Sequence, residues 1–124
     1  MRTLALPLLA AALLAACGTE TPSAAPQGTN LVVTVDPDGP HGSAPGRTAR
    51  LRCPGAGCAL TKRVTVDDFA PARSDQACSM VYGGPETATV KGTLRGSAIN
   101  AGFSRTDGCQ TNRWRRVQRL LSAA

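Results

Sequence analysis

The side chains in this sequence that could carry out chemistry are few and poorly placed for it. His41 is the only histidine of the 124 residues, and in the segment GPHGSAPG it stands close to Ser43, as a base beside a nucleophile would. A catalytic serine needs a base that a third group orients on a rigid element. A loop rich in glycine and proline provides no such element, so we expect His41 to be a surface residue.

Paired carboxylates, which general acid and base catalysis uses, are not favourably spaced either. Asp67 and Asp68 are adjacent in sequence and therefore point apart, and Asp36 and Asp38 belong to a turn-rich segment. The sequence contains no P-loop, no dinucleotide-binding fingerprint and no cluster of metal ligands. We therefore predict a protein that is not an enzyme and that uses no cofactor and no metal.

The first residues predict export. MRTLALPLLAAALLAACG has a positive charge at Arg2, an apolar run too short for a membrane span of about 20 residues, and then Cys17. Residues 14–17, LAAC, resemble the bacterial lipoprotein signal, in which a diacylglyceryl group is attached to the cysteine. The alternative is an ordinary secretory signal in which Cys17 has no role. We expect a lipoprotein signal peptide at 1–16, a lipid anchor on Cys17 at the outer face of the cell membrane, and a flexible tether at 17–30.

Four further cysteines remain for the folded domain, namely Cys53, Cys58, Cys78 and Cys109. An even number in an exported protein predicts two disulfides, and the spacing alone leaves three pairings open. A zinc site built from all four is the alternative, but the spacings are wide and unequal. Disulfides are also expected because a domain of this size has a small core.

The chain is basic, with 14 lysines and arginines against 8 acidic residues and a formal net charge of +6. Four arginines, at positions 113, 115, 116 and 119, crowd the C-terminal stretch RWRRVQRLL. This stretch could be a basic amphipathic segment that lies against anionic headgroups, or a solvated end that improves solubility. Nucleic-acid binding is not expected, because the sequence shows no pattern of aromatic residues that could stack on bases.

The elements that must position these residues predict an α+β domain around an antiparallel sheet. The β-branched run LVVTV at 31–35 predicts a strand, followed by a long loop rich in turn formers. TARLRC predicts a second strand, with Ala49 and Leu51 on one face. The segment at 59–77 stays open between helix and strand, because its β-branched residues and its helical spacing disagree.

Residues 86–105 predict a β-hairpin. Ala88 and Val90 fall on one face of its first strand, and apolar residues continue at positions 94, 99, 101 and 103. Gly92, Gly96 and Gly102 interrupt this pattern and are expected at turns or bulges. The whole sequence therefore predicts four or five strands and at most two helices.

The segment CSMVYGGP at 78–85 places Met80, Val81 and Tyr82 directly between a cysteine and a pair of glycines. One interpretation is a buried strand end, since large apolar residues are scarce in this chain. The other is an exposed recognition loop. An extended peptide can pair with a protease while its side chains enter pockets, and a disulfide at its edge would hold it in the bound shape.

From Leu31 to about Trp114 the sequence resembles the Streptomyces subtilisin inhibitor family of exported serine protease inhibitors. The matching parts are LVVTV, the cysteines at 53 and 58, CSMVY, Gly92 and the stretch FSRTDGC at 103–109. The resemblance implies a five-stranded antiparallel sheet with two helices on one face, the disulfides Cys53–Cys58 and Cys78–Cys109, and often a homodimer. We therefore expect a subtilisin-inhibitor-like domain at 31–124, with a basic C-terminal tail.

The same resemblance implies a reactive bond between Met80 and Val81. Met80 would enter the primary pocket of a subtilisin-like or chymotrypsin-like protease, with Val81 and Tyr82 on the leaving side. Ser79 would precede Met80, and Cys78 would act as a constraint. From position 83 on, GGP replaces the family's Asp-Pro continuation, which predicts a looser backbone. The alternative function is a non-inhibitory cell-surface lipoprotein binding module on the same fold.

Overall fold

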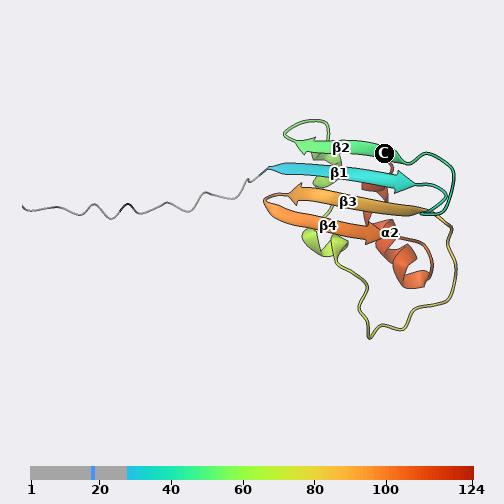
Figure 1. The fold of residues 1–124 in the computed structure, drawn as a ribbon. Helices are drawn as coiled ribbons and strands as arrows, with labels where there is room; N and C mark the ends of the chain where they lie inside the picture. The colour runs from blue at the N-terminus through green and yellow to red at the C-terminus, as the bar shows by residue number, and fades with distance from the viewer. Residues whose placement is uncertain (1–17, 19–27) are drawn as a thin grey trace, which may run out of the picture.

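The structure is a computed structural model that describes Gly18 and residues 28–124 (Figure 1). Cys17, the predicted signal peptide and most of the predicted tether lie outside the described residues. Four antiparallel strands form one sheet in the order β2-β1-β3-β4. The strands are β1 (Thr29–Asp36), β2 (Arg47–Cys53), β3 (Thr87–Leu94) and β4 (Ser97–Phe103). The predicted α+β class is confirmed, whereas the described residues contain no fifth strand.

The strands form where apolar side chains alternate. Along β1, Leu31, Val33 and Val35 are buried and the intervening side chains are partly exposed. Leu31 lies opposite Leu51 of β2 on one side and opposite Gly92 of β3 on the other. This register carries all the buried positions to one face of the sheet, because side chains alternate between faces with a period of two.

The β3–β4 hairpin is confirmed, and its turn is made by Arg95 and Gly96. Both residues have positive φ, 46° and 85°, as a two-residue hairpin turn requires. The Arg95 guanidinium then donates to the carbonyls of Thr61 and Val64, at 2.9 and 2.6 Å. Of the three glycines expected at turns or bulges, Gly96 lies in the turn, but the expectation is wrong for Gly92 and Gly102, which pair in continuous register within β3 and β4.

The undecided segment at 59–77 contains two short helical turns and no strand. They are the helix α1 (Cys58–Thr61) and the 3₁₀ turn η1 (Val66–Phe69). At the start of η1, the carboxylate of Asp68 accepts from the backbone N–H of Thr65, at 2.8 Å. Thr65 and Asp68 thus form a capping box, in which each side chain accepts from the backbone N–H of the other. This capping explains why β-branched residues adopt a helical turn here.

The arginine-rich C-terminal segment forms the longest helix, α2 (Gly108–Leu121). Asp107 caps it by accepting from the backbone N–H of Gln110 at 2.9 Å. Val117, Leu120 and Leu121 are buried, and burial of each such side chain contributes about 1.5–3 kcal/mol. The C-terminal residues therefore cover the sheet as a helix and do not extend it by a strand.

Arg113 is buried on the inner side of α2 although it is charged. Its guanidinium donates to the carbonyls of Ala70 and Gly102, at 2.8 and 3.1 Å, and lies 4.8 Å from the ring centre of Phe103. Burial lowers the pKa of Arg113, and nearby Arg116 lowers it further. Arg113 thus joins α2, β4 and the end of η1, and it is not part of a solvated tail.

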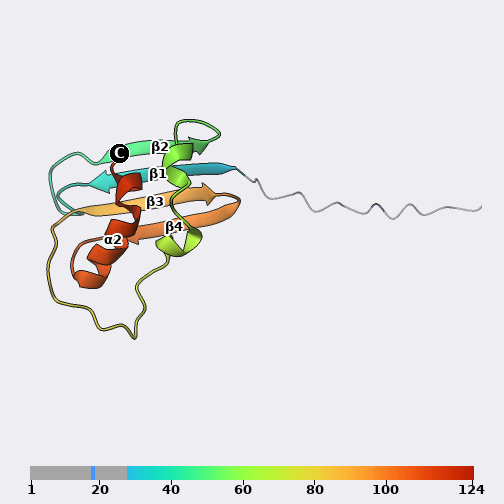
Figure 2. The ribbon, with the colours of Figure 1, turned by 180° about the vertical axis from the view of Figure 1, so that it is seen from behind.

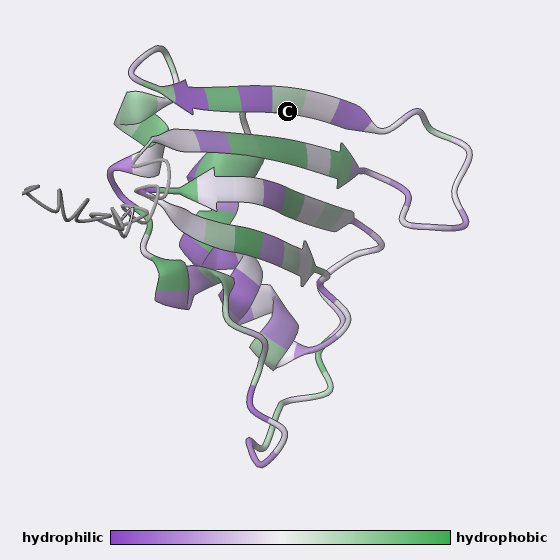
Figure 3. Ribbon diagram, turned by 60° about the vertical axis from the view of Figure 1, so that its left-hand side comes forward, coloured by the Kyte–Doolittle hydropathy of each residue, from purple (hydrophilic) through white to green (hydrophobic). Residues whose placement is uncertain are grey.

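The helices cover one face of the sheet and leave the other face open (Figures 1 and 2). The open face carries polar side chains, among them the exposed Arg50, Arg52 and Lys91. In Figure 3, hydrophilic and hydrophobic residues alternate along β2, as expected for a sheet with one solvent-exposed face. Among the described residues, no helix is long and apolar enough to cross a membrane.

Candidate functional site

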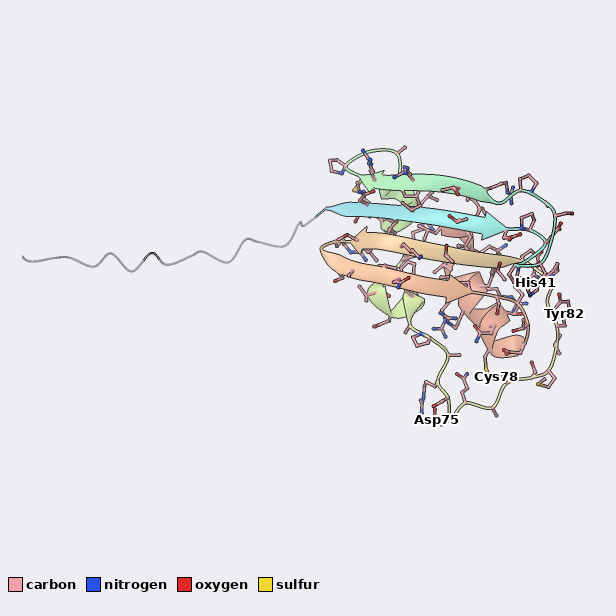
Figure 4. The ribbon with its side chains drawn as sticks, viewed as in Figure 1. His41, Asp75, Cys78 and Tyr82 are labelled. Carbon is pink, nitrogen blue, oxygen red and sulfur yellow. A yellow bond between two sulfur atoms is a disulfide. The ribbon has the colours of Figure 1, made fainter. Side chains whose placement is uncertain are left out.

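The segment at 78–85 is an exposed loop that leads into β3. Met80, Val81 and Tyr82 have relative exposures of 89%, 67% and 62%, although the chain has few large apolar residues to spare. Figure 4 shows Tyr82 at the end of the sheet where β1 ends and β3 begins. The interpretation of this segment as a buried strand end is therefore wrong.

The loop is held on its N-terminal side by two bonds to the start of α2. Cys78 forms a disulfide with Cys109, with a Cα–Cα distance of 5.3 Å. The carbonyl of Ser79 accepts from the backbone N–H of Gly108 at 2.9 Å. The other pair, Cys53 and Cys58, closes the short turn between β2 and α1. The two disulfides are thus paired as the family resemblance implies.

The loop is also held on its C-terminal side, where the sequence predicts a looser backbone. The backbone N–H of Gly83 donates to the carbonyl of Arg105 at 2.7 Å. The side chain of Arg105 in turn forms an ion pair with Glu86, at 3.0 Å. Gly84 has a φ of +143°, and a Cβ there would lie 2.1 Å from a carboxylate oxygen of Glu86. The glycine pair therefore allows the chain to pass closely over this ion pair.

Both attachments come from residues 104–109, which we call the bracing segment. It connects β4 to α2 and supplies Arg105, Gly108 and Cys109. Between the two attachments, within the described part of the chain, no hydrogen bond holds Met80, Val81 or Tyr82 to the body. The result is a short exposed peptide with fixed ends.

Sequence reasoning did not find the roles of Arg105, Gly108 and Glu86. The stretch FSRTDGC at 103–109 belongs to the family resemblance, but nothing in its residue types indicates a contact with CSMVYGGP at 78–85. Glu86 and Arg105 form an ion pair in the structure but are 19 residues apart in the sequence. Local periodicity carries no information on such pairs. Only the family resemblance offered a signal, because the pairing of Cys78 with Cys109 that it implies brings the two segments together.

A second loop, between β1 and β2, supports the same end of the molecule. Gly39 has a φ of +73°, and a Cβ there would lie 2.5 Å from the carbonyl oxygen of Pro85. Asp38 orders this loop by accepting from the backbone N–H of Ala44 at 3.1 Å. His41 lies in it, exposed and at the same end as Tyr82 (Figure 4).

The residues considered for catalysis are not assembled into a site. Both His41 and Ser43 are exposed, and within residues 28–124 neither side chain has a hydrogen-bond partner. Nothing therefore orients the imidazole as a general base. Asp107 lies near Cys78 and Cys109, but the two sulfurs are bonded to each other and are not thiolate ligands.

No protein-family model, no curated protein and no solved structure matches the chain. The family resemblance therefore stays a hypothesis, and the geometry of the loop carries the functional argument.

Proposed function

We propose that this protein is a serine protease inhibitor that presents residues 79–82 as a rigid, substrate-like loop. It performs no catalysis of its own. Its partner is a subtilisin-like or chymotrypsin-like protease, and the reactive bond lies between Met80 and Val81.

The observation that carries the proposal is the exposure of three consecutive apolar side chains on a loop whose two ends are fixed. Met80 is 89% exposed, while Ser79 and Gly83 are hydrogen-bonded to the bracing segment. Exposed apolar residues in a well-held segment are typical of a surface that another protein binds. A loop ordered before binding loses little conformational entropy when a protease binds it.

The same attachments favour inhibition over rapid turnover. After hydrolysis of the Met80–Val81 bond, Cys78 would stay bonded to Cys109, and Gly83 would stay bonded to Arg105. The two new ends would remain near each other in the protease, because neither can diffuse away. Release of products would be slow and re-formation of the bond favourable.

The side chain of Met80 sets the expected specificity. It is unbranched, flexible and uncharged, so it suits a broad apolar primary pocket. A trypsin-like protease, whose pocket binds a cation, should be inhibited poorly. Replacing Met80 by lysine should therefore move inhibition from subtilisin toward trypsin.

The test is the inhibition constant of the full chain, with Cys17→Ser and both disulfides formed, against subtilisin. We expect nanomolar or tighter inhibition, and Met80→Ala should weaken it by about 10- to 100-fold, the cost of removing a large apolar side chain from a pocket. Val66→Ala is the matched control, because Val66 is an exposed apolar residue in η1. Absence of inhibition by the parent protein would leave the non-inhibitory binding module as the better description.

We further propose that the inhibitor is exported and held at the outer face of the membrane through a lipid on Cys17. The signal-like N-terminus and the two disulfides support this location, because disulfides persist in oxidising compartments. Mass spectrometry of the native N-terminal peptide tests it. An unmodified Cys17 in a freely secreted protein would contradict the anchor.

A further inference from the structure

Another exposed loop, residues 71–77, directly precedes the segment at 78–85, which we call the reactive loop. Figure 4 shows Asp75 at the outer tip of this segment, away from the sheet. Arg73 and Asp75 have side-chain exposures of 78% and 66%. The segment contains one turn, in which the backbone N–H of Gln76 donates to the carbonyl of Arg73 at 3.2 Å.

This loop differs from the reactive loop in its attachments. Its N-terminal end is held where Arg113 donates to the carbonyl of Ala70, and the next attachment is the disulfide of Cys78. Between them, in the part of the chain that the structure describes, no backbone N–H or carbonyl pairs with a backbone group outside the loop. The Cys109 sulfur lies 3.8 Å from the Ala77 carbonyl, but it is disulfide-bonded and has no proton to donate. The backbone at Arg73 can therefore adapt to a protease active site.

Arg73 is also the basic residue of the described chain best placed for cleavage. The others lie in β2, β3 or α2, next to α1, in the hairpin turn or in the bracing segment, at positions 47, 50, 52, 62, 63, 91, 95, 105, 113, 115, 116 and 119. Proteolysis needs an exposed segment that can leave regular hydrogen bonding at low cost. Residues 71–77 meet this need.

The two loops differ in whether a disulfide ring encloses the bond to be cut. The Met80–Val81 bond lies inside the ring closed by Cys78 and Cys109, so a cut there leaves the fragments covalently joined. The Arg73–Ser74 bond lies outside both rings, since the other disulfide joins Cys53 and Cys58. A cut after Arg73 therefore separates β1 and β2 from β3, β4 and α2, with no covalent link between them.

We propose that the Arg73–Ser74 bond is a processing site at which an arginine-specific, trypsin-like protease inactivates the inhibitor. The step is hydrolysis: the amide bond breaks, the Arg73 carbonyl gains the hydroxyl of water, and Ser74 becomes a free amino terminus. The two fragments are then joined only by non-covalent contacts, which include the β1–β3 ladder, the shared core and the hydrogen bonds of Arg95 and Arg113, so their association depends on concentration. The inactivation rests on the proposed function, and the cleavage itself does not.

Asp75 controls the rate of this step. Its carboxylate binds the Arg73 guanidinium through two hydrogen bonds, from Nε at 3.0 Å and from Nη2 at 2.6 Å. The protease must take this guanidinium into its own pocket, so the ion pair has to open first. Because both side chains are largely exposed, the pair slows cleavage without preventing it.

The experiment is a limited digest of the full chain, with Cys17→Ser, by a small amount of trypsin, followed by intact mass under non-reducing conditions. We expect one early cut that yields two separate fragments, the second starting at Ser74. Arg73→Gln should resist this cut, and Asp75→Asn should be cut a few-fold faster. Arg63→Gln, at an exposed arginine beside α1, is the matched control and should be cut like the parent. A first cut elsewhere in residues 28–124, or equal cleavage of Arg73→Gln, would overturn the site.

Inactivation is measured on the purified, cut protein by its inhibition of subtilisin at decreasing concentration. We expect inhibition weakened by at least about tenfold on dilution, because the fragments dissociate. Full inhibition retained by completely cut, diluted protein would overturn the inactivation. If the uncut protein does not inhibit subtilisin, the proposed function fails, while fragment masses and size-exclusion chromatography still decide the cleavage and the separation.

Discussion

The carbonyl oxygen of Ser79 accepts a hydrogen bond from the backbone N–H of Gly108, at 2.9 Å, directly beside the exposed Met80. This contact links the proposed reactive loop to the first residue of α2. A Cβ at Gly108 would lie 2.1 Å from the hydroxyl oxygen of Ser79, so a side chain there requires this hydroxyl to move. The first turn of α2 therefore sets the position of Ser79, which precedes Met80 of the proposed reactive bond.

Gly108→Ala should weaken inhibition of subtilisin without lowering stability. Alanine is favoured over glycine in a helix interior by about 0.5–1 kcal/mol and should be tolerated at this first helical position, but its methyl group would displace the Ser79 hydroxyl beside Met80. The double variant Ser79→Ala with Gly108→Ala removes the clashing hydroxyl and should regain inhibition, with Ser79→Ala alone as control. The measurements are inhibition constants and thermal unfolding. A single variant that inhibits like the parent would show that the position of Ser79 is unimportant.

Removing the Cys78–Cys109 disulfide should convert the proposed inhibitor into a substrate of subtilisin. In the chain-entropy account, this disulfide stabilises the fold by about 3–4 kcal/mol, and the shorter Cys53–Cys58 ring by about 2 kcal/mol. Replacing Cys78 and Cys109 by alanine should give rapid cleavage at Met80–Val81 by subtilisin. The corresponding change at Cys53 and Cys58 should lower stability and leave the loop resistant. Digests followed by mass spectrometry decide between these outcomes, and equal resistance of both variants would contradict the role of Cys78.

The ion pair between Glu86 and Arg105 should hold the leaving side of the loop. It is partly buried, so we expect a coupling of about 0.5–1 kcal/mol in a double-mutant cycle of Glu86→Gln and Arg105→Gln. Either variant should be cut faster at Met80–Val81, because the glycine pair loses the charged side chains over which it passes. The cycle is measured by denaturant unfolding and by the rate of loop cleavage. Additive effects would mean that the pair has no role in holding the loop.

The carboxyl of Asp75 should titrate at a lower pH than an ordinary aspartate. The hydrogen bond from the Arg73 side chain holds the pKa of Asp75 below its usual value of 3.8. The folded-state pKa is thus below the unfolded one, so the interaction is present above the unfolded pKa and is lost as the pH falls through the folded pKa. NMR titration should show this low midpoint and its return toward the usual value in Arg73→Gln. An unchanged midpoint would contradict the ion pair in solution.

Arg113→Ala should destabilise the whole fold by about 2–4 kcal/mol, because it removes a buried side chain that donates to the carbonyls of Ala70 and Gly102 and that contacts Phe103. Arg116→Ala is the control. Arg116 is exposed on the same helix, and its loss should change stability by less than about 0.5 kcal/mol. Denaturant unfolding measures both. Equal effects of the two variants would show that Arg113 behaves as a surface residue.

The sequence by itself determined the sheet strands and the disulfide chemistry. The β-branched run at 31–35 predicted β1, and alternating apolar residues predicted the β3–β4 hairpin, because a strand with one buried face needs a period of two. The glycines at 92, 96 and 102 predicted turns or bulges without distinguishing among them, and the structure places the turn at Gly96, where φ is positive. The even cysteine count predicted two disulfides, although their pairing came from the family resemblance.

Only the tertiary structure decided the remaining features. The segment at 59–77 and the arginine-rich C-terminus have ambiguous or polar local patterns, and packing on the sheet made them helical turns and α2, so the expected fifth strand is absent from the described residues. The exposure of Met80 and the contacts of Gly83 and Ser79 with the bracing segment depend on residues far apart in the chain. Local patterns report which face of an element is apolar. They contain no information on which distant backbone groups will meet, and those meetings fix the ends of the loop.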